Sequence, residues 1–323
     1  MQAATIEKIL SRLFEATRIL ILTHVRPDGD ALGSAFGMRS WLQENGKNAV
    51  VFLAEAPPDC YKNICQGALI ATAVDYRDFD TVVILDCGDD SRICCPPTGL
   101  PPAEKSVNID HHTGNNVSAQ YSLVAKEFSS TCEICAAVAL HDSRKISAET
   151  ATFFYLGMMT DTGCFKFSNT NGRVMRMAAD LLDAGVELEK LVNAVYFSSP
   201  LKRLQLESDI VSNHLKMAFD NRFAYAYISD ELLAKHNFDI KESENIIDII
   251  RSIDSVITAA LIYRKGGAFK ISLRSKDSRF PILGIAKHFG GGGHPLAGGC
   301  SVETDCVEKV EALLLAEMKK VLD

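Results

Sequence analysis

This chain of 323 residues has one tryptophan, no long apolar run and no excess of positive charge. Without a run of about 18 apolar residues or a secretory signal at the start, a cytoplasmic protein is expected rather than a membrane protein. The ten cysteines are scattered, which favours a reducing compartment over a disulfide framework. A net charge of -7 argues against binding to duplex DNA, which needs a positive surface. A single tryptophan and 8% aromatic residues offer little surface on which a long single strand could stack.

The length and the 47% share of hydrophobic residues suit two folded domains. Short apolar strands alternate with helical segments in the first half, which predicts an α/β fold with a mostly parallel sheet for residues 1–186. The segment 187–215 is polar, helical in pattern and interrupted by Ser198-Ser199-Pro200, so it is predicted to be a helical connector. Residues 216–323 are expected to form a second, smaller α/β domain.

Local spacing and end signals place the individual elements. A helix is predicted from Asp30 or Ala31 to Asn45, with Gly46 as its stop. The capping-box pattern Ser130-x-x-Glu133 predicts a helix over 131–141. A hairpin is expected over 256–263 and 268–273. Further strands are predicted at 19–22, 48–53, 82–85, 107–109 and 222–228, and further helices at 148–159, 172–184, 244–253, 281–288 and 307–322.

Metal-ligand residue types recur at four separated places in the first half. Three of these places follow short apolar runs, so parallel strands would deliver them to one sheet edge. The fourth follows the helix predicted at 148–159 and would have to fold back onto that edge. The residues are His24 with Asp28 and Asp30, then Asp86, then Asp110 with His111 and His112, and finally Asp161.

The ligand types themselves indicate a chemistry. Carboxylates and imidazoles without thiolates favour a hard or borderline divalent ion, with Mn²⁺ the best guess and Mg²⁺, Co²⁺ or Zn²⁺ behind it. Asp28 and Asp30 would face opposite ways in an extended loop and could hold two ions, and Asp86, alone at its strand end, would bridge them. Two ions about 3.5 to 4 Å apart suit in-line displacement at phosphorus, so phosphoester hydrolysis is predicted.

These motifs, in this order, resemble those of the DHH phosphoesterase superfamily. The first motif appears as His24 to Ser34 (HVRPDGDALGS), the second as Asp86, the third as Asp110 to His112 and the fourth as Asp161. The resemblance implies one metal on His24, Asp28 and Asp86, and another on Asp30, Asp86, His111 and Asp161. It implies that His112 contacts the scissile phosphate or its attacking water, and that Asp110 orients the ligands without binding a metal.

The resemblance continues in the second half, where Phe289 to Gly299 (FGGGGHPLAGG) looks like the glycine-rich motif of the companion DHHA1 domain. Glycines let backbone N–H groups approach an anion, His294 adds a donor, and Arg274 could clamp a phosphate. A catalytic cleft between the two domains is expected from the resemblance. Whether Arg26 reaches substrate or solvent stays open. The predicted substrate-binding residues are Arg274, Gly291, Gly292, Gly293 and His294.

Within the superfamily, the chain looks most like the bacterial nanoRNase and 3′-phosphoadenosine-5′-phosphate (pAp) phosphatase group. The expected substrates are therefore short oligoribonucleotides and pAp, with no duplex DNA or membrane partner, and a homodimer stays open. Cleavage of pApA or cyclic di-AMP is an alternative. A manganese-dependent inorganic pyrophosphatase is less favoured because GGGGHPLAGG replaces the Ser-Arg-Lys pattern of that family. A nucleotide sensor without turnover is disfavoured by the complete set of ligand positions.

Overall fold

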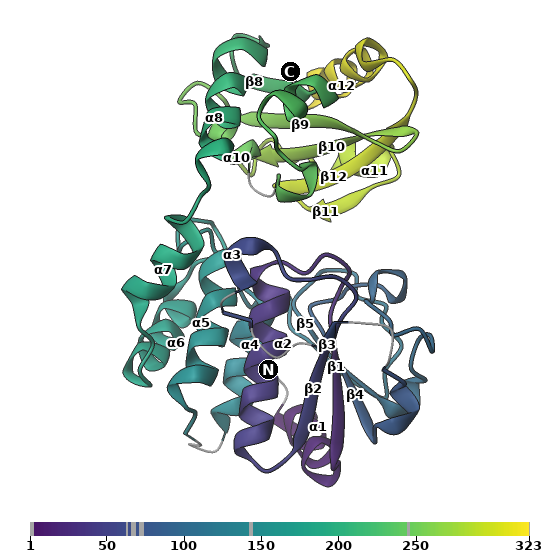
Figure 1. Ribbon diagram of the computed structural model, residues 1–323, viewed down its shortest axis with the longest axis vertical. Helices are drawn as coiled ribbons and strands as arrows, with labels where there is room; N and C mark the ends of the chain where they lie inside the picture. Colours follow the sequence, from purple (N-terminus) through teal and green to yellow (C-terminus); the bar gives the residue numbers. More distant parts are fainter. Residues whose placement is uncertain are drawn as a thin grey trace. The chain divides into compact units, whose positions relative to one another are not determined.

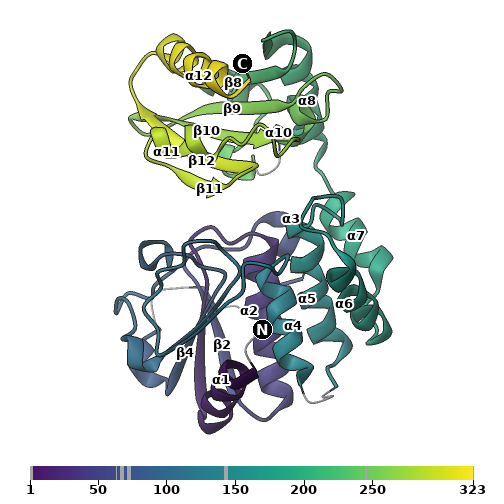
Figure 2. The same ribbon diagram turned by 180° about the vertical axis from the view of Figure 1, so that it is seen from behind.

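The computed structural model describes residues 3–62, 64–65, 69–70, 74–141, 145–243 and 246–322. The chain folds into two compact units, Met1–Ser198 and Ser199–Asp323. Each unit contains one sheet with its own helices (Figures 1 and 2). The predicted α/β class, with a parallel sheet in the first half, is confirmed. The division falls inside the segment 187–215, whose role as a connector stays a prediction.

The first unit is built on a six-stranded sheet with the order β3-β2-β1-β4-β5-β6. All neighbouring strands run parallel, for example with Leu20 beside Val82 and Val83 beside Val107. Valine, isoleucine and leucine fill the central strands because both faces of a parallel sheet are buried. The strands are β1 (Arg18–Leu22), β2 (Asn48–Leu53), β3 (Leu69–Ile70), β4 (Thr81–Leu85), β5 (Ser106–Asp110) and β6 (Tyr121–Val124).

The two faces of this sheet are covered differently. One face packs against helices, with α2 and α4 beside the strands and α5 against α2 and α4 (Figure 1). The other face is closed by loops, whose Phe79, Ile93 and Val117 pack on Leu20 and Ile84. The helices of this unit are α1 (Ala3–Glu15), α2 (Gly29–Glu44), α3 (Asp59–Lys62), α4 (Thr131–Ala139), α5 (Ala148–Asp161), α6 (Gly172–Asp183) and α7 (Leu188–Tyr196), with short 3₁₀ turns at Tyr76–Asp78, Asp90–Arg92 and Ala103–Lys105.

Helix α2 is buried on nearly all sides because it lies between the sheet and α5. Glycines allow this approach: a Cβ atom at Gly33 would lie 2.6 Å from the carbonyl oxygen of Phe153, and one at Gly37 would meet the ring of Phe154 at 2.5 Å. The predicted helix from Asp30 or Ala31 to Asn45 is thus confirmed within a residue or two. The close packing holds the amino-terminal end of α2 beside the carboxyl-terminal end of α5, where a Cβ atom at Gly29 would collide with Thr160.

The second unit has a six-stranded, mostly antiparallel sheet with the order β11-β12-β10-β9-β8-β7, in which β8 and β9 are parallel. The predicted hairpin is confirmed as β9 and β10. Helices α11 and α12 pack on one face of the sheet, and α8 and α10 on the other. The strands are β7 (Leu215–Ala218), β8 (Phe223–Ile228), β9 (Thr258–Lys265), β10 (Ala268–Ser275), β11 (Gly292–His294) and β12 (Ala297–Glu303).

The helices of the second unit partly match the predicted ranges. The predicted helix 244–253 appears as α10 (Ile247–Arg251), and its first residues, 244 and 245, lie outside the described residues. A π-helical turn, Ile210–His214, leads from α8 into β7. Among the residues that the structure describes, no helix has the length and apolar character needed to cross a membrane. The remaining helices are α8 (Leu201–Asp209), α9 (Asp230–Lys235), α11 (Leu283–His288) and α12 (Val307–Leu322), with a 3₁₀ turn at Ile240–Glu242.

Candidate metal centre

The predicted ligand residues of the first unit meet at the carboxyl edge of the parallel sheet. His24 lies two residues beyond β1, Asp86 directly follows β4, and Asp110 is the last residue of β5. Asp161, the last residue of α5, joins them because α5 packs along α2. Open parallel sheets bind ligands at this edge.

The first group of ligand atoms consists of His24, Asp28 and Asp86. The Nε2 atom of His24 lies 3.9 Å from Oδ2 of Asp28 and 3.7 Å from Oδ2 of Asp86. The other ring nitrogen, Nδ1, is hydrogen-bonded to the carbonyl oxygen of Val25 at 2.9 Å, which directs the Nε2 lone pair toward the carboxylates. Asp28 caps α2 through Oδ1, which accepts the N–H groups of Asp30 and Ala31, so Oδ2 is left to face His24.

The second group is centred on the Nε2 atom of His111. This atom lies 3.7 Å from Oδ1 of Asp86, 3.9 Å from Oδ2 of Asp30 and 3.8 Å from Oδ2 of Asp161. Two atoms bound to one ion at about 2.1 Å each lie about 3 to 4 Å apart, whereas a hydrogen bond would bring them to about 2.9 Å. The spacing in both groups therefore suits metal ligands.

Asp86 belongs to both groups because its two oxygens face different histidines. Oδ2 lies near His24, while Oδ1 lies near His111. Asp86 also has a left-handed backbone, with φ of 55°, which asparagine and aspartate tolerate better than most residues. The backbone turns sharply as it leaves β4, and the buried carboxylate is placed between the two groups.

The first turn of α4 holds two of these carboxylates. The N–H of Thr131 donates to Oδ2 of Asp30 at 2.7 Å, and the N–H of Cys132 donates to Oδ1 at 2.9 Å. The hydroxyl of Thr131 donates to Oδ1 of Asp86 at 3.0 Å. The N-terminal end of a helix dipole favours negative charge, so α4 stabilises ionised carboxylates in a buried position.

Burial and mutual repulsion make the carboxylates costly to ionise without a cation. Burial, followed by the charges of Asp86 and Asp161, raises the pKa of Asp30 well above its usual value. Burial and the charge of Asp28 raise the pKa of Asp86, and burial raises the pKa of Asp161 to about 7. A divalent ion would offset both effects, so the residues fit a metal centre.

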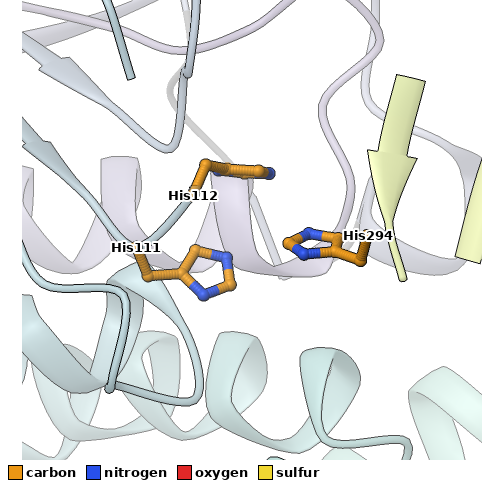
Figure 3. Close-up of side chains that lie close together, drawn as sticks. All are labelled: His111, His112 and His294. Carbon is orange, nitrogen blue, oxygen red and sulfur yellow. The ribbon is translucent and has the colours of Figure 1, made fainter. Parts of the chain in front are cut away.

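His112 and Asp110 form a hydrogen-bonded pair that adjoins this centre, since Nδ1 of His112 also lies 3.5 Å from Oδ1 of Asp86. Figure 3 shows the rings of His111 and His112 close together. Their centroids lie 4.7 Å apart, and the rings meet edge to face. Nδ1 of His112 is hydrogen-bonded to Oδ1 of Asp110 at 2.7 Å, and the amide of Asn115 donates to the other carboxylate oxygen at 2.6 Å. Burial alone would lower the pKa of His112, but the bond to Asp110 and the charge of Asp86 raise it to about 9. For Asp110, the effect of burial is outweighed by His112 and Asn115, and its pKa is lowered.

Arg274 and His294 lie in the second unit, on β10 and β11. Both are paired in register with Ala297 of β12, from its two sides. Residues directly opposite in an antiparallel sheet project to the same face, so Arg274 and His294 share one face across the small side chain of Ala297. Figure 3 also labels His294. Their part in substrate binding stays a prediction.

The glycine-rich stretch forms a tight hairpin rather than an open loop. A Cβ atom at Gly291 would lie 2.0 Å from the carbonyl oxygen of Gly299, and one at Gly293, where φ is +136°, would lie 2.3 Å from that of Ala297. These two glycines are thus required for β11 to approach β12, whatever ligand is bound. At Gly292 a Cβ atom would meet nothing within 4 Å, so this glycine is the best candidate of the three for backbone approach to an anion.

Three residues near the site were not predicted. Thr131 contacts the carboxylate of Asp86, and Asn115 contacts that of Asp110. Gly157 on α5 leaves room for the carboxylate of Asp30, which a Cβ atom there would meet at 2.6 Å. The capping box identified the start of α4 but not what its first turn binds. Cys132 and Cys135 are buried on α4, and burial raises the pKa of both thiols well above the usual value, as expected for packing residues rather than zinc ligands.

Two domain families match this chain. The model of the DHH family, N-terminal domain, matches residues 18–158, and that of the DHHA1 domain matches residues 220–322. The bifunctional oligoribonuclease and PAP phosphatase NrnA of Thermus thermophilus is 29% identical over 286 residues, covering 88% of this chain and 84% of that protein. Its namesake in Bacillus subtilis is 25% identical over 288 residues, covering 88% and 89%. An exopolyphosphatase-related protein of Bacteroides fragilis has a similar fold, with a TM-score of 0.87, 27% identity, and coverage of 99% of this chain and 97% of that one.

The chain belongs to the DHH family of phosphoesterases and carries a DHH domain followed by a DHHA1 domain. The resemblance seen in the motifs is thereby confirmed. The protein is a hydrolase of phosphoester bonds, in a metal-dependent family, and its buried aspartates and histidines form groups that could hold metal ions.

Proposed function

We propose that this protein uses two divalent metal ions to hydrolyse short oligoribonucleotides to mononucleotides, pAp to AMP and phosphate, or both. The observation that carries the two-metal part is the position of Asp86, whose two oxygens each lie 3.7 Å from a different histidine. The substrate part is supported by the names of the relatives in Thermus thermophilus and Bacillus subtilis, which align over most of the chain.

The donor set is the basis for assigning the ions. One ion would be held by His24, Asp28 and Oδ2 of Asp86, and the other by Asp30, His111, Asp161 and Oδ1 of Asp86. Oxygen and imidazole ligands favour Mn²⁺, with Mg²⁺ and Co²⁺ as alternatives. When bound, two such ions polarise the attacking water and the phosphoryl oxygens in an in-line displacement.

The remaining residues of the site act on the phosphate and on one another. Nδ1 of His112 is hydrogen-bonded to Asp110, so the Nε2 nitrogen of the ring is the one assigned to the scissile phosphate. Asp110 is fixed by Asn115, whose amide also donates to the carbonyl oxygen of Cys87 at 2.9 Å. This chain of hydrogen bonds sets the orientation of the His112 ring. A positive imidazole in that orientation would stabilise the negative charge of the reacting phosphate.

A substrate panel tests the proposal. We expect kcat/KM with Mn²⁺ to be highest for pAp or for ribonucleotides of two to five residues. It should fall steeply for strands of about ten residues or more, because strands of that length need a binding surface for single-stranded nucleic acid. The physical reason is that a long strand needs cations and aromatic rings along its path, and the chain has a net charge of -7 and one tryptophan. The panel should also contain pApA, cyclic di-AMP, pyrophosphate and a 25-residue RNA.

The panel separates the alternatives directly. Equal kcat/KM on 5-residue and 25-residue RNA would overturn the short-substrate assignment in favour of a processive exonuclease. Preference for pApA, cyclic di-AMP or pyrophosphate would replace the proposed substrate while leaving phosphoester or phosphoanhydride hydrolysis in place. Nucleotide binding with no turnover of any member would identify a sensor.

The second unit is proposed to bind the part of the substrate that does not react. Arg274→Ala and His294→Ala are expected to raise KM for nucleotides at unchanged manganese content, because neither residue belongs to the ligand groups of the first unit. Losing one charge-assisted contact to phosphate costs about 1.5 to 3 kcal/mol, or roughly 10- to 150-fold in KM. Steady-state kinetics with metal analysis would measure both effects.

Arg264 provides a matched control for this prediction. It lies exposed on β9 in register with Phe269, so it projects to the sheet face opposite that of Arg274. Arg264→Ala removes the same charge from the same sheet and should leave KM within about twofold, as is usual for an exposed position. Unchanged KM in both Arg274→Ala and His294→Ala would remove this face from the substrate site.

A further inference from the structure

We propose that Thr131 is a positioning residue that holds two proposed metal ligands, Asp30 and Asp86, in place relative to one another. The inference rests on the proposed two-metal function. Thr131 acts through Asp30 and Asp86, each assigned above to the second ion, and Asp86 also to the first.

The contacts of Thr131 join two segments that are far apart in sequence. Its N–H binds the carboxylate of Asp30, at the start of α2, and its hydroxyl binds that of Asp86, at the end of β4. The three residues are at most 2% exposed, so water does not compete for these bonds. A single residue thus sets the separation of two proposed ligands.

The hydroxyl also determines which way the carboxylate of Asp86 is turned. It donates to Oδ1, the oxygen that lies 3.7 Å from Nε2 of His111 and 3.5 Å from Nδ1 of His112, and this bond leaves Oδ2 directed at His24. Without the hydroxyl, the carboxylate could rotate about its χ2 angle, a broad torsion with a low barrier. Both oxygens could then turn toward one ion, and the bridge would be lost.

Helix α4 is anchored firmly enough to serve this purpose. Ser130 caps the helix by accepting the N–H of Glu133 at 3.1 Å, and Glu133 accepts the N–H of Ser129 at 2.7 Å. The carboxylate of Glu133 is fully buried and paired with Arg173 at 2.7 Å. Removing one partner of such a pair would destabilise the fold as a whole, so neither Glu133 nor Arg173 is a useful site for the test.

A merely structural role for the hydroxyl is the competing explanation, and Thr150 provides the control for it. Thr150 is also fully buried in the first turn of a helix, α5, and its hydroxyl also donates to a carboxylate, that of Glu44, at 2.6 Å. Glu44 ends α2, so it lies about 21 Å along that helix from Asp30. Thr150→Val therefore removes a hydrogen bond between a threonine hydroxyl and a carboxylate away from the metal centre, although Glu44 is exposed where Asp86 is buried.

The experiment compares Thr131→Val, Thr131→Ser and Thr150→Val in the full chain. Calorimetry measures manganese binding, and electron paramagnetic resonance measures the coupling between two bound manganese ions. The melting temperature of each variant is measured in EDTA. We expect Thr131→Val to weaken the binding of one ion by about tenfold or more, as for a lost bond to a charged group, and to diminish the coupled signal. Thr131→Ser should restore both, and Thr150→Val should leave both unchanged.

The outcomes are decisive in either direction. Wild-type affinity and coupling in Thr131→Val, or equal losses in Thr150→Val, would overturn the positioning role. If Thr131→Val does not fold, Thr131→Ala against Thr131→Ser makes the same comparison, since the two differ by one hydroxyl. Failure of the wild-type protein to bind two ions would instead count against the proposed function, so the two failures are distinguishable.

Discussion

Asp86→Asn is expected to lower kcat by roughly a thousandfold at saturating Mn²⁺, because it removes the carboxylate proposed to bridge both ions. A loss of about 4 kcal/mol of electrostatic stabilisation corresponds to that factor. The amide has one oxygen and no charge, so it can serve one ion only weakly. Single-turnover kinetics, together with metal analysis, would measure the loss of rate and the accompanying loss of bound manganese.

Asparagine is the better replacement because Asp86 has a left-handed backbone, with φ of 55°. Asparagine tolerates this conformation, whereas alanine would add backbone strain and confuse a folding defect with a catalytic one. Burial raises the pKa of Asp86, so its ionised form destabilises the metal-free protein at neutral pH. The neutral variant should therefore melt in EDTA at a temperature at least as high as that of the wild type.

Asp80, the residue before the same strand, provides a control. It precedes β4 at the opposite edge of the sheet, where its carboxylate accepts the N–H groups of Thr17 and Arg18. Asp80→Asn keeps an acceptor for these bonds and should leave kcat unchanged. Retention by Asp86→Asn of more than about a tenth of the wild-type rate would contradict the bridging role, given the several kcal/mol expected of it.

Much of the metal centre could be predicted because its signals are local. Each of His24, Asp86 and Asp110 ends or follows a short apolar run, and the edge at which parallel strands end is common to all of them. Asp161 was recognised by residue type, but only the family resemblance assigned it to an ion, since nothing in the sequence of α5 indicates that it packs along α2. The deeply buried α2 was recognised as a helix from its spacing, but its glycines are explained only by the approach of α5.

What escaped prediction depends on contacts between distant segments. Thr131 lies 101 residues from Asp30 and 45 from Asp86, and an isolated threonine after a helix cap carries no signal of either contact. In the glycine-rich stretch, by contrast, the sequence carried a signal, because its composition suggested that backbone N–H groups approach an anion. Two of its glycines are required by the backbone of the neighbouring strand, and this requirement is visible only when the hairpin is formed.

His112→Ala is expected to lower kcat by about 100- to 1,000-fold while leaving two manganese ions bound, because the imidazole is proposed to act on the phosphate rather than on a metal. Its Nδ1 nitrogen is hydrogen-bonded to Asp110 at 2.7 Å, and that bond and the charge of Asp86 raise the pKa of His112 to about 9 despite burial. This raised pKa favours the protonated ring at neutral pH in the metal-free site. Bound metal ions would repel the protonated form and so lower the pKa of His112.

His111→Ala is the matched control, since it removes the same side chain one residue away. Nε2 of His111 lies within 3.9 Å of three carboxylates, so this variant should lose one ion as well as turnover. Equilibrium dialysis with Mn²⁺, followed by kinetics at saturating metal, distinguishes the two histidines. A loss of manganese from His112→Ala as large as that from His111→Ala would show that His112 is itself a metal ligand. The hydrogen bond to Asp110 would then serve to orient that ligand, as carboxylates commonly do for histidines bound to metal ions.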